Sequence, residues 1–442
     1  MKMMNYIKTI LSILIVLLSV EVSAQRLLTK KEAIQITLEN NYGIKIATNN
    51  VEIAKNNSSI YNSGYLPSLV ALGGANYDNS DQEIEQHDGA TSTINGAETN
   101  TYNASLGINY TLFDGLGRKY DYKVLKENFN LTELEARETI ENTYLQLFSV
   151  YFQIARLSKN TDNLKETLEI SKLRLERIQY QNDYGQSTKL ELLKAEVDVN
   201  NDSINYINIR QQFINSKRDL NIILGVQLED DYEVETEVDF LTLLSFDELL
   251  SISLENNVVL KQQEKNITIS EYNIRANKGN YFPRVGLTGS YGWNEIDNPT
   301  TAAFAGTTTT GFRAGVNVSW NVFDGGTTKT RVANSKIALD SQEILQTQQF
   351  ETLENVLKNT SEEYTNKLFI LSAQEKNVIT NQNNFDRSVE QYKLGQINSI
   401  DFRLAQVNLL NAQTDLTNTK YETKLIELEL LQLSGQILNV EF

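Results

Sequence analysis

The chain has 442 residues, a formal net charge of −17, a single histidine and no cysteine. The lack of cysteine excludes a disulfide framework, a thiolate metal site and a lipid anchor on an N-terminal cysteine. One histidine cannot form a His-based metal or catalytic cluster, and so acidic a chain lacks the basic surface that nucleic acid requires. We therefore expect no cofactor, no metal and no nucleic-acid partner.

The first 24 residues have the pattern of a secretory signal. Lys2 and Lys8 flank the start of an apolar run, Ile10 to Val20, that is too short to span a bilayer, and small residues at 23–24 form a cleavage site. We expect residues 1–24 to be removed on export. No later stretch of the sequence is apolar enough for a transmembrane helix, so a membrane location would require β-strands.

The rest of the sequence is duplicated. Leu38–Asn41 recurs as Leu254–Asn257, a shift of 216 residues from position 38 to position 254. Leu112–Gly115 recurs in similar form as Val322–Gly325, a shift of 210 residues from 112 to 322. One loop of the first half is therefore six residues longer, and two similar halves account for nearly all of the chain after the signal.

Each half is predicted to contain a helix, two strands separated by a loop, a very long helix, a tight turn and a returning helix. The expected boundaries are 25–225 for the first repeat, 226–245 for a linker, 246–434 for the second repeat and 435–442 for a C-terminal segment.

Four stretches alternate between apolar and polar residues with a period of two, which is typical of amphipathic strands. They are residues 68–77, 103–113, 284–293 and 313–323. About ten residues is the length at which a tilted strand crosses the hydrocarbon layer. A water-soluble amphipathic sheet would show the same alternation, so the strands alone favour a membrane sheet only slightly.

Aromatic residues recur at matching positions of the two repeats. Tyr77 corresponds to Trp293, and Tyr110 corresponds to Trp320. Aromatic side chains are enriched at both interfaces of a membrane. Together with the signal, this placement favours membrane strands, and we expect these four side chains at the membrane interfaces.

Two very long helices are expected, each followed by a tight turn at a glycine and by a returning helix. The two hairpins comprise residues 118–182 with 188–224 and residues 327–394 with 399–432. Apolar residues recur every seven positions along both long helices, which predicts left-handed supercoiling against neighbouring helices. Such a helix content is far above that of an ordinary compact domain.

Four strands cannot close a barrel, because the smallest membrane barrels have eight. An open sheet edge in lipid would leave backbone groups unpaired at a cost of several kcal/mol each. The sequence therefore predicts that the chain shares its strands with copies of itself, and that its long helices continue the ring as a hollow cylinder.

The order and spacing of several short motifs resemble the TolC family of outer membrane factors. The motifs are Tyr65–Ser68, Leu112–Gly115, Leu192–Ala195, Tyr281–Pro283, Val322–Gly326 and Tyr392–Gly395. The resemblance covers essentially all of the chain after the signal. It implies a mainly α protein with membrane β-strands: a homotrimer whose 12-stranded β-barrel, with four strands per chain, continues into a periplasmic α-barrel.

The resemblance also implies a function. Such a protein is the outer-membrane channel of a tripartite efflux pump or type I secretion system in a Gram-negative bacterium. It is a passive conduit and not an enzyme; it lies in outer-membrane lipid and works with a periplasmic adaptor and an inner-membrane pump of the RND, ABC or MFS type. A non-conducting coiled-coil envelope protein is the alternative, but it would not need two matched strand pairs. A periplasmic enzyme would need a nucleophile–base or metal constellation, which the sequence lacks.

Three residues take the places of gate residues of this family. Asp401 matches a carboxylate of the periplasmic constriction, Tyr392 matches a tyrosine that stabilises the closed state, and Glu191 matches an acidic residue that takes part in the same closure. Where the family has a second acidic residue in the constriction, this chain has Leu404, and where the family has a basic residue, this chain has Ile397. A closure based on charges would therefore be weaker.

The two turns between the long helices match the tips that meet the adaptor in this family. These tip residues are Gly185, Gln186, Ser187, Gly395, Gln396 and Ile397.

The same residues also have purely structural interpretations. Thr188 and Glu191 form a capping-box pattern, and Asn398 with Asp401 is its analogue. The two turn glycines are typical helix C-caps. Tyr392 continues the heptad of the second long helix, so packing is its default role.

Overall fold

The computed structural model describes residues 26–440 except 230, 231, 243, 244, 301 and 303; the expected signal lies outside the described residues. The chain forms two compact units. The first contains the chain up to Ala47 together with Glu138–Asn257 and Thr352–Phe442, and the second contains Thr48–Arg137 and Val258–Glu351. Each unit thus takes segments from both sequence repeats. The predicted repeat boundaries follow the duplication and differ from the compact units, because the long helices run through both units.

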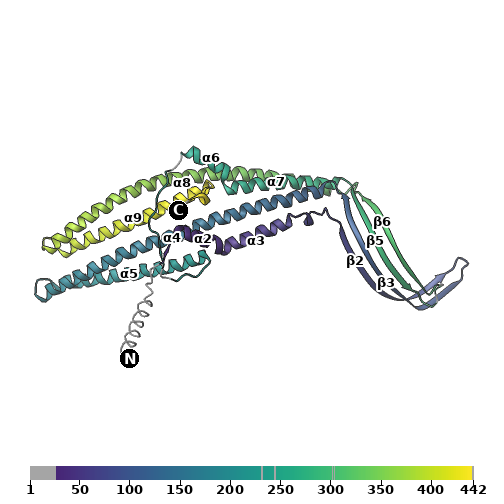
Figure 1. The fold of residues 1–442 in the computed structure, drawn as a ribbon, viewed down its shortest axis with the longest axis horizontal. Coiled ribbons are helices and arrows are strands. Elements are labelled where there is room, and N and C mark those ends of the chain that lie inside the picture. Colours follow the sequence, from purple (N-terminus) through teal and green to yellow (C-terminus); the bar gives the residue numbers. More distant parts are fainter. Residues whose placement is uncertain (1–25, 230–231, 243–244, 301, 303, 441–442) are drawn as a thin grey trace, which may run out of the picture. The chain divides into compact units, whose positions relative to one another are not determined.

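The second unit contains one antiparallel sheet of four strands, in the order β2–β3–β5–β6 (Figure 1). The strands are β2 (Ser68–Glu85), β3 (Thr91–Phe113), β5 (Arg284–Asp297) and β6 (Gly306–Ser319). The two hairpins have matching registers: Ser68 lies opposite Asn109 in the first, and Arg284 lies opposite Ser319 in the second.

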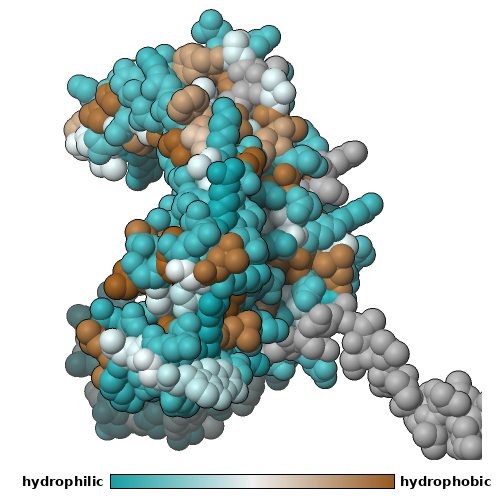
Figure 2. All heavy atoms as spheres, turned by 90° about the vertical axis from the view of Figure 1, so that its left-hand side faces the viewer, coloured by the Kyte–Doolittle hydropathy of each residue, from teal (hydrophilic) through white to brown (hydrophobic). Residues whose placement is uncertain are grey.

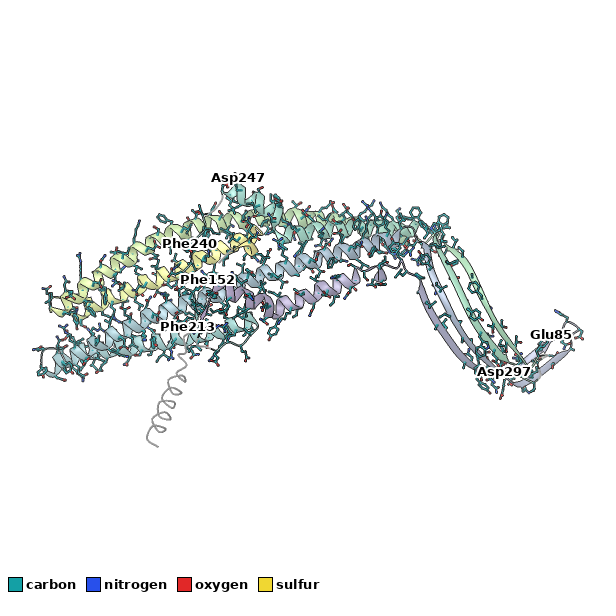
Figure 3. All side chains as sticks on the ribbon, in the orientation of Figure 1. Glu85, Phe152, Phe213, Phe240, Asp247 and Asp297 are labelled. Carbon is teal, nitrogen blue, oxygen red and sulfur yellow. The ribbon has the colours of Figure 1, made fainter. Side chains whose placement is uncertain are left out.

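Three strands extend beyond their predicted ends. β2 and β3 continue as a two-stranded hairpin past the point where Asn100 pairs with Asp297, the last residue of β5, and Figure 3 shows Glu85 beyond Asp297. β5 itself ends at Asp297 and not at 293. These extensions are rich in Thr, Asn and acidic residues on both faces, so they lack the apolar alternation that marks a strand with one buried face.

The fourth strand is shifted relative to the prediction of 313–323. β6 begins at Gly306, because the polar run Thr307–Thr310 continues the pairing with β5. It ends at Ser319, and the following chain turns back so that the Val322 N–H donates to the Trp320 carbonyl at 3.1 Å. Trp320 therefore lies outside the strand, where its indole N–H donates to the Tyr281 carbonyl at 3.1 Å.

The rest of the second unit consists of helices near the start of the strands. It contains α7 (Val258–Lys278), the short 3-10 helices η1 (Ile60–Asn62) and η2 (Gly279–Tyr281), and parts of α3 (Tyr42–Asn57), α4 and α8. α7 is joined to α8 by hydrogen bonds from the Asn277 amide to Ser335 at 2.8 Å and from the Gln263 amide to the Gln342 carbonyl at 2.8 Å.

The first unit is helical and contains the two predicted hairpins (Figure 1). Its helices are α2 (Lys30–Asn40), α4 (Gly117–Asp183) with α5 (Lys189–Leu224), α6 (Phe246–Asn256), and α8 (Thr327–Lys393) with α9 (Ser399–Leu433). A 3-10 helix, η3 (Ile437–Asn439), follows α9. Among the described residues, no helix is both long and apolar enough to cross a membrane.

The core of the first unit is an aromatic cluster on α4 and α9. Phe148 stacks on Phe152 at 5.6 Å between ring centroids, and Phe152 stacks on Tyr421 at 5.8 Å. Phe148, Tyr151 and Phe152 are fully buried. Offset stacking of this kind adds about 0.5–1.5 kcal/mol per pair to the burial of the rings.

The predicted linker 226–245 is attached to this core by tyrosine hydroxyls. It contains β4 (Glu233–Val234), which pairs in parallel with β1 (Leu27–Leu28). The Tyr151 hydroxyl donates to the Leu28 carbonyl at 2.7 Å and accepts from the Glu235 N–H at 2.9 Å. The Tyr421 hydroxyl donates to the Thr236 carbonyl at 2.9 Å. Burial raises the pKa of both tyrosines, so they remain protonated donors.

Two glycines lie where a returning helix, α5 or α9, ends close to the first helix of the same repeat, α2 or α6. Gly225 has φ +70°, and a Cβ there would lie 2.3 Å from the Asn40 carbonyl oxygen. Its counterpart Gly435 has φ +67°, and a Cβ there would lie 2.4 Å from the Asn256 carbonyl oxygen. Both positions therefore require glycine, because φ is positive and because the neighbouring backbone leaves no room for a Cβ atom.

This geometry predicts that Gly225→Ala lowers the apparent Tm more than Gly185→Ala does. Gly185 has nearly the same φ, +71°, but nothing within 4 Å of an added Cβ. Alanine at Gly185 costs only the left-handed strain, about 1–2 kcal/mol, whereas alanine at Gly225 must also displace backbone. The Tm is measured by circular dichroism on the purified protein in detergent, and equal Tm values for the two variants would contradict the close approach.

Candidate functional site

The two predicted tips are helix C-caps with the same geometry. Gly185 has φ +71° and Gly395 has φ +73°. In the first turn the Gln186 N–H donates to the Gln181 carbonyl at 2.7 Å, and in the second the Gln396 N–H donates to the Gln391 carbonyl at 2.9 Å. These six-to-one bonds define Schellman motifs, which leave a small exposed tip. Ser187 and Ile397, the last predicted tip residues, are both half-buried.

Glu191 is a capping residue at the start of α5. Its carboxylate accepts hydrogen bonds from the Ser187 hydroxyl at 2.6 Å and from the Thr188 N–H at 3.2 Å, while the Thr188 hydroxyl accepts from the Glu191 N–H at 3.2 Å. The predicted capping box is thus confirmed. The Ser187 hydroxyl and then the Thr188 N–H lower the pKa of Glu191. In the described part of the chain, Glu191 makes no hydrogen bond with Tyr392.

Asp401 lies at the equivalent place in α9 but is not held in the same way. The Asn398 side chain caps the helix, accepting from the Ile400 and Asp401 N–H groups at 2.9 Å each. The Asp401 side chain is exposed, and no hydrogen bond or ion pair engages its carboxylate within residues 26–440 as described. Its carboxylate is therefore available to solvent and to partners.

Tyr392 packs between an aromatic ring and a cation. Its ring stacks on Phe402 of α9 at 4.8 Å between centroids, and the Arg177 guanidinium of α4 lies 4.8 Å from its ring centre. Arg177 also donates to the Lys393 carbonyl at 3.2 Å. Tyr392 thus packs within the second hairpin and also contacts the first.

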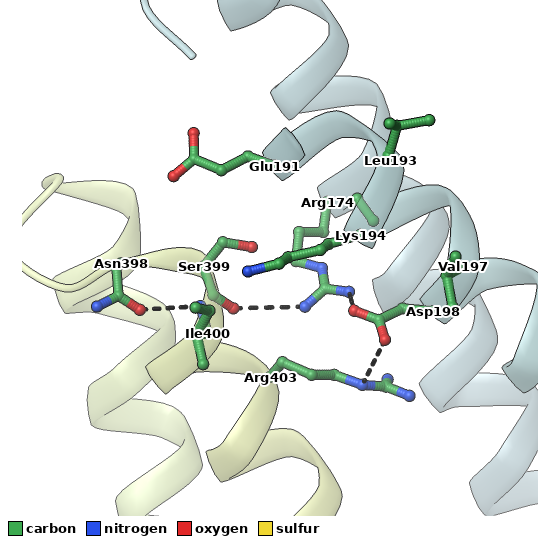
Figure 4. Close-up of a pocket in the computed structure, with 11 residues that line it drawn as sticks. Arg174, Glu191, Leu193, Lys194, Val197, Asp198, Asn398, Ser399, Ile400 and Arg403 are labelled. Atoms are coloured by element: carbon green, nitrogen blue, oxygen red, sulfur yellow. Dashed lines mark hydrogen bonds and ion pairs between the residues drawn. The ribbon is translucent and has the colours of Figure 1, made fainter. Parts of the chain in front are cut away.

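An ionic network, which was not predicted, connects the two hairpins, and Figure 4 shows its Arg174, Asp198 and Arg403 side chains. Arg174 of α4 pairs with Asp198 of α5 and donates to the Ser399 carbonyl of α9 at 3.4 Å. Arg403 of α9 binds Asp202 of α5 through two nitrogens, each at 2.7 Å from a carboxylate oxygen. The Arg174 side chain is 2% exposed and the Asp202 side chain is 3% exposed.

Buried charges of this kind are stable only when they are paired. Removing one partner of a buried ion pair costs about 3–5 kcal/mol, because the other charge is left without compensation. Asp202 also accepts from the Ser171 hydroxyl at 2.6 Å, so its Oδ2 atom has a second hydrogen-bond donor besides Arg403. The network therefore holds α9 against α4 and α5 within this unit.

The network borders a groove of about 480 Å³ at the base of the tips. Its lining includes Glu191, Lys194 and Ile400 as well as Arg174 and Arg403, but not Asp401. Figure 2 shows that the face on the side of the tips is largely hydrophilic, with separate hydrophobic spots. Among the described residues, no group of three or more His, Asp or Glu side chains is placed to hold a metal ion.

The sequence carried a signal for this network. Asp198, Asp202 and Arg403 have no charged counterpart in the other repeat, where Asn408, Ala412 and Leu193 stand at the matching positions. Charges that the duplication does not preserve indicate a contact that occurs at only one of the two repeat interfaces. Whether these charged residues meet depends on which helices are neighbours, and the heptad pattern does not identify the neighbours.

The sheet presents one mainly apolar face and one mainly polar face, which also carries Val70 and Leu72, because paired residues of neighbouring strands point to the same side. On the apolar face, Leu106 lies opposite Tyr291, which lies opposite Phe312. The apolar face comprises Leu69, Ala71, Tyr77, Ala104, Leu106, Ile108, Tyr110, Val285, Leu287, Tyr291, Trp293, Phe312, Ala314, Val316 and Val318. Three of the four predicted interface aromatics, Tyr77, Tyr110 and Trp293, lie on it. Trp320 follows the end of β6.

The sequence matches the model of the outer membrane efflux protein family over residues 33–226 and 249–436, which is most of the chain. The chain belongs to the outer membrane efflux protein family. The match falls once in each half of the duplicated sequence, and similar solved structures are described as channels.

The relatives of the chain are described as outer membrane proteins, and one of them as part of an efflux pump. The chain is 23% identical over 420 residues to the toluene efflux pump outer membrane protein of Pseudomonas putida, covering 92% of this chain and 82% of that protein. It is 20% identical over 381 residues to the outer membrane protein TolC of Vibrio cholerae, covering 85% of this chain and 83% of that protein. The chain is thus an outer membrane protein of a Gram-negative bacterium.

Solved structures show the same fold. The outer membrane channel CmeC of Campylobacter jejuni superposes with a TM-score of 0.78 at 17% identity, covering 92% of this chain and 85% of that chain. The outer membrane protein VceC of Vibrio cholerae superposes with a TM-score of 0.74 at 13% identity, covering 92% and 95%. The TolC-like fold predicted from the sequence is confirmed.

The capping box predicts a pH dependence confined to the start of α5. Because the folded protein lowers the pKa of Glu191, the stabilisation is fully present above the ordinary glutamate value and is lost as the pH falls through the lowered value. Hydrogen exchange of the amides in the first turn of α5, corrected for intrinsic rates, is therefore expected to accelerate in this acidic range.

Glu191→Gln is the control, because glutamine also fits a capping box but does not titrate. This variant is expected to lose the pH dependence of protection in α5. Amides in the middle of α5, which lie away from the cap, are expected to show no such change in either protein. The same acid-induced acceleration in the Gln variant would contradict the role of Glu191.

Proposed function

We propose that the chain is a passive efflux conduit assembled from three copies. The four-stranded sheets of the copies join into one 12-stranded barrel in the outer membrane, and the long helices form a tunnel in the periplasm. The single observation that carries this proposal is a sheet with two unpaired edges and one exposed apolar face.

The apolar face of the sheet is not covered by the chain itself. Leu69 is 67% exposed, Phe312 is 71% exposed and Val316 is 64% exposed. An exposed apolar surface of this extent marks a contact with lipid or protein. Lipid outside and water inside suit one apolar and one polar face of a barrel wall.

The stagger of the sheet supports closure into a barrel. Tyr77 of β2 pairs with Asn100 of β3, which pairs with Asp297 of β5. Asp297 of β5 therefore lies level with Tyr77 of β2, whereas the repeat counterpart of Tyr77 is Trp293. The equivalent strands β2 and β5 are thus offset by four residues, from 293 to 297. A closed barrel requires such a shear between tilted strands.

An open sheet edge explains why more than one copy is needed. β2 and β6 are the two edge strands, and each pairs on one side only among the described residues. In lipid each unpaired backbone group costs several kcal/mol. Identical copies around an axis remove both edges at once, and three copies supply the 12 strands that the family resemblance implies.

The names of the relatives favour efflux over type I protein secretion. The Pseudomonas putida relative is described as part of a toluene efflux pump, and the Brucella suis relative as an outer membrane efflux protein. A passive conduit needs an inner-membrane pump of the RND, ABC or MFS type and a periplasmic adaptor. We assign the adaptor contact to the exposed tips at 185–187 and 395–397, where glycine leaves room for a close approach.

The periplasmic end is expected to be narrowed by Asp401. Three copies of an exposed carboxylate around one axis would place like charges close together, and such a ring binds cations. Tyr392 and the ionic network keep α9 in place behind Asp401. Glu191 is already engaged in its cap, so we assign it a smaller part in the constriction.

Single-channel conductance in a planar bilayer tests this function. Purified protein is expected to conduct with a preference for cations, and polyvalent cations added on the periplasmic side are expected to block it. Asp401→Asn is expected to remove the block, because it removes the charge of the ring. Glu191→Gln, the matched change in the first repeat, is expected to keep the block.

Two outcomes would count against the proposal. If the block persists in Asp401→Asn, the cation site lies elsewhere. If the wild-type protein and the double variant Asp401→Ala, Tyr392→Phe both fail to conduct, the non-conducting envelope protein is the better interpretation.

A further inference from the structure

The duplication repeats the register of the hairpins as well as their sequence. Tyr77 pairs with Asn100 in the β2–β3 hairpin, and their counterparts Trp293 and Thr310 pair in the β5–β6 hairpin. The six-residue difference in loop length lies between the strands and does not change this register. The two hairpins are therefore equivalent building units of one sheet.

Among the described residues, the two strand hairpins meet at one place, the pairing of β3 with β5. There Ala104 lies opposite Trp293 and Asn103 lies opposite Asn294. The other edge of each hairpin, β2 in the first and β6 in the second, has no strand beside it among the described residues. β6 is the counterpart of β3, and β2 is the counterpart of β5.

We propose that β6 of one copy pairs with β2 of the next copy in the register of the β3–β5 junction. The counterpart of Ala104 is Ala314 and that of Trp293 is Tyr77, so Ala314 faces Tyr77 of the next copy. One position earlier on β6, Arg313 faces Asp78 of the next copy. This register rests on the proposed assembly of several copies.

The charges agree with this register. Arg313 and Asp78 are both exposed in the single chain, and the register brings them face to face with opposite sign. Both lie on the polar face, since each neighbours an apolar-face residue, Ala314 or Tyr77. Opposite charges directly across two strands are stabilising by about 0.2–1 kcal/mol.

The other positions agree as well. Val316 would face Ala75 and Val318 would face Gly73 on the apolar face, while Gly315 would face Asn76 on the polar face. A slip by one residue would mix apolar with polar positions along the whole junction. A slip by two would keep the faces but would set Arg313 opposite Asn76 or Ser80, without the ionic partner.

Engineered disulfides between copies can test this register directly, because the chain has no cysteine of its own. Two in-register variants are Tyr77→Cys with Ala314→Cys and Asn76→Cys with Gly315→Cys. Adjacent pairs alternate between narrow and wide spacing in an antiparallel ladder, so one of the two is well placed for a disulfide. The controls are displaced by two residues on the same face: Tyr77→Cys with Phe312→Cys, and Asn76→Cys with Asn317→Cys.

Mild oxidation of the purified protein in detergent is expected to join copies in at least one in-register variant. The products are covalent dimers and trimers on a denaturing gel, and the displaced variants are expected to give much less. If the displaced variants crosslink as well as the in-register variants, or better, this register is wrong.

A charge reversal tests the ionic pair separately. Arg313→Glu is expected to lower the fraction of assembled copies, and adding Asp78→Arg to it is expected to restore that fraction. Arg284→Glu is the matched control, because Arg284 is on the same face of β5 but lies opposite Ser319 within the chain. Loss of assembly that the second change does not restore would contradict the pair.

The outcomes separate this register from the proposed assembly. If the wild-type protein is monomeric and does not conduct, the assembly itself is wrong. If it conducts while the displaced cysteine pairs crosslink best, the assembly stands and only the register falls.

Discussion

The unpaired edges of the four-stranded sheet are the constraint on which the rest of the protein depends. Backbone N–H and C=O groups that face lipid must find partners, and in the described part of the chain β2 and β6 each have a neighbouring strand on one side only. The exposed apolar side chains of the sheet also need a partner surface, either lipid or protein. In the proposed assembly a ring of identical copies meets both demands, and the bore of that ring is the conduit.

In the proposed assembly the helical unit forms the tunnel and must keep its hairpins aligned. The Arg174–Asp198 and Arg403–Asp202 pairs do this near the tips, beside the small apolar cluster that contains Phe402. Further along, the aromatic cluster around Phe152 and the tyrosine-bound segment that contains β4 hold the same helices. Both sets of contacts lie within one chain, so the alignment of its two helical hairpins needs no residue from a second copy.

Much of this organisation could be predicted from the sequence. Alternation located all four strands, heptads located the long helices, and the turn glycines and the capping box at Thr188 lie where the pattern indicated. The polar ends of the strands were missed because a strand without a buried face has no alternation to read. The Arg403–Asp202 contact was missed because helix neighbours are fixed by tertiary packing, which periodicity does not reveal.

The number of copies that share one sheet can be measured by native mass spectrometry of the protein extracted in mild detergent. We expect a single assembly with the mass of three chains, stable without any partner protein, since the copies complete one another's sheet. A monodisperse monomer under the same conditions would contradict it, because both sheet edges would then be satisfied without a second copy.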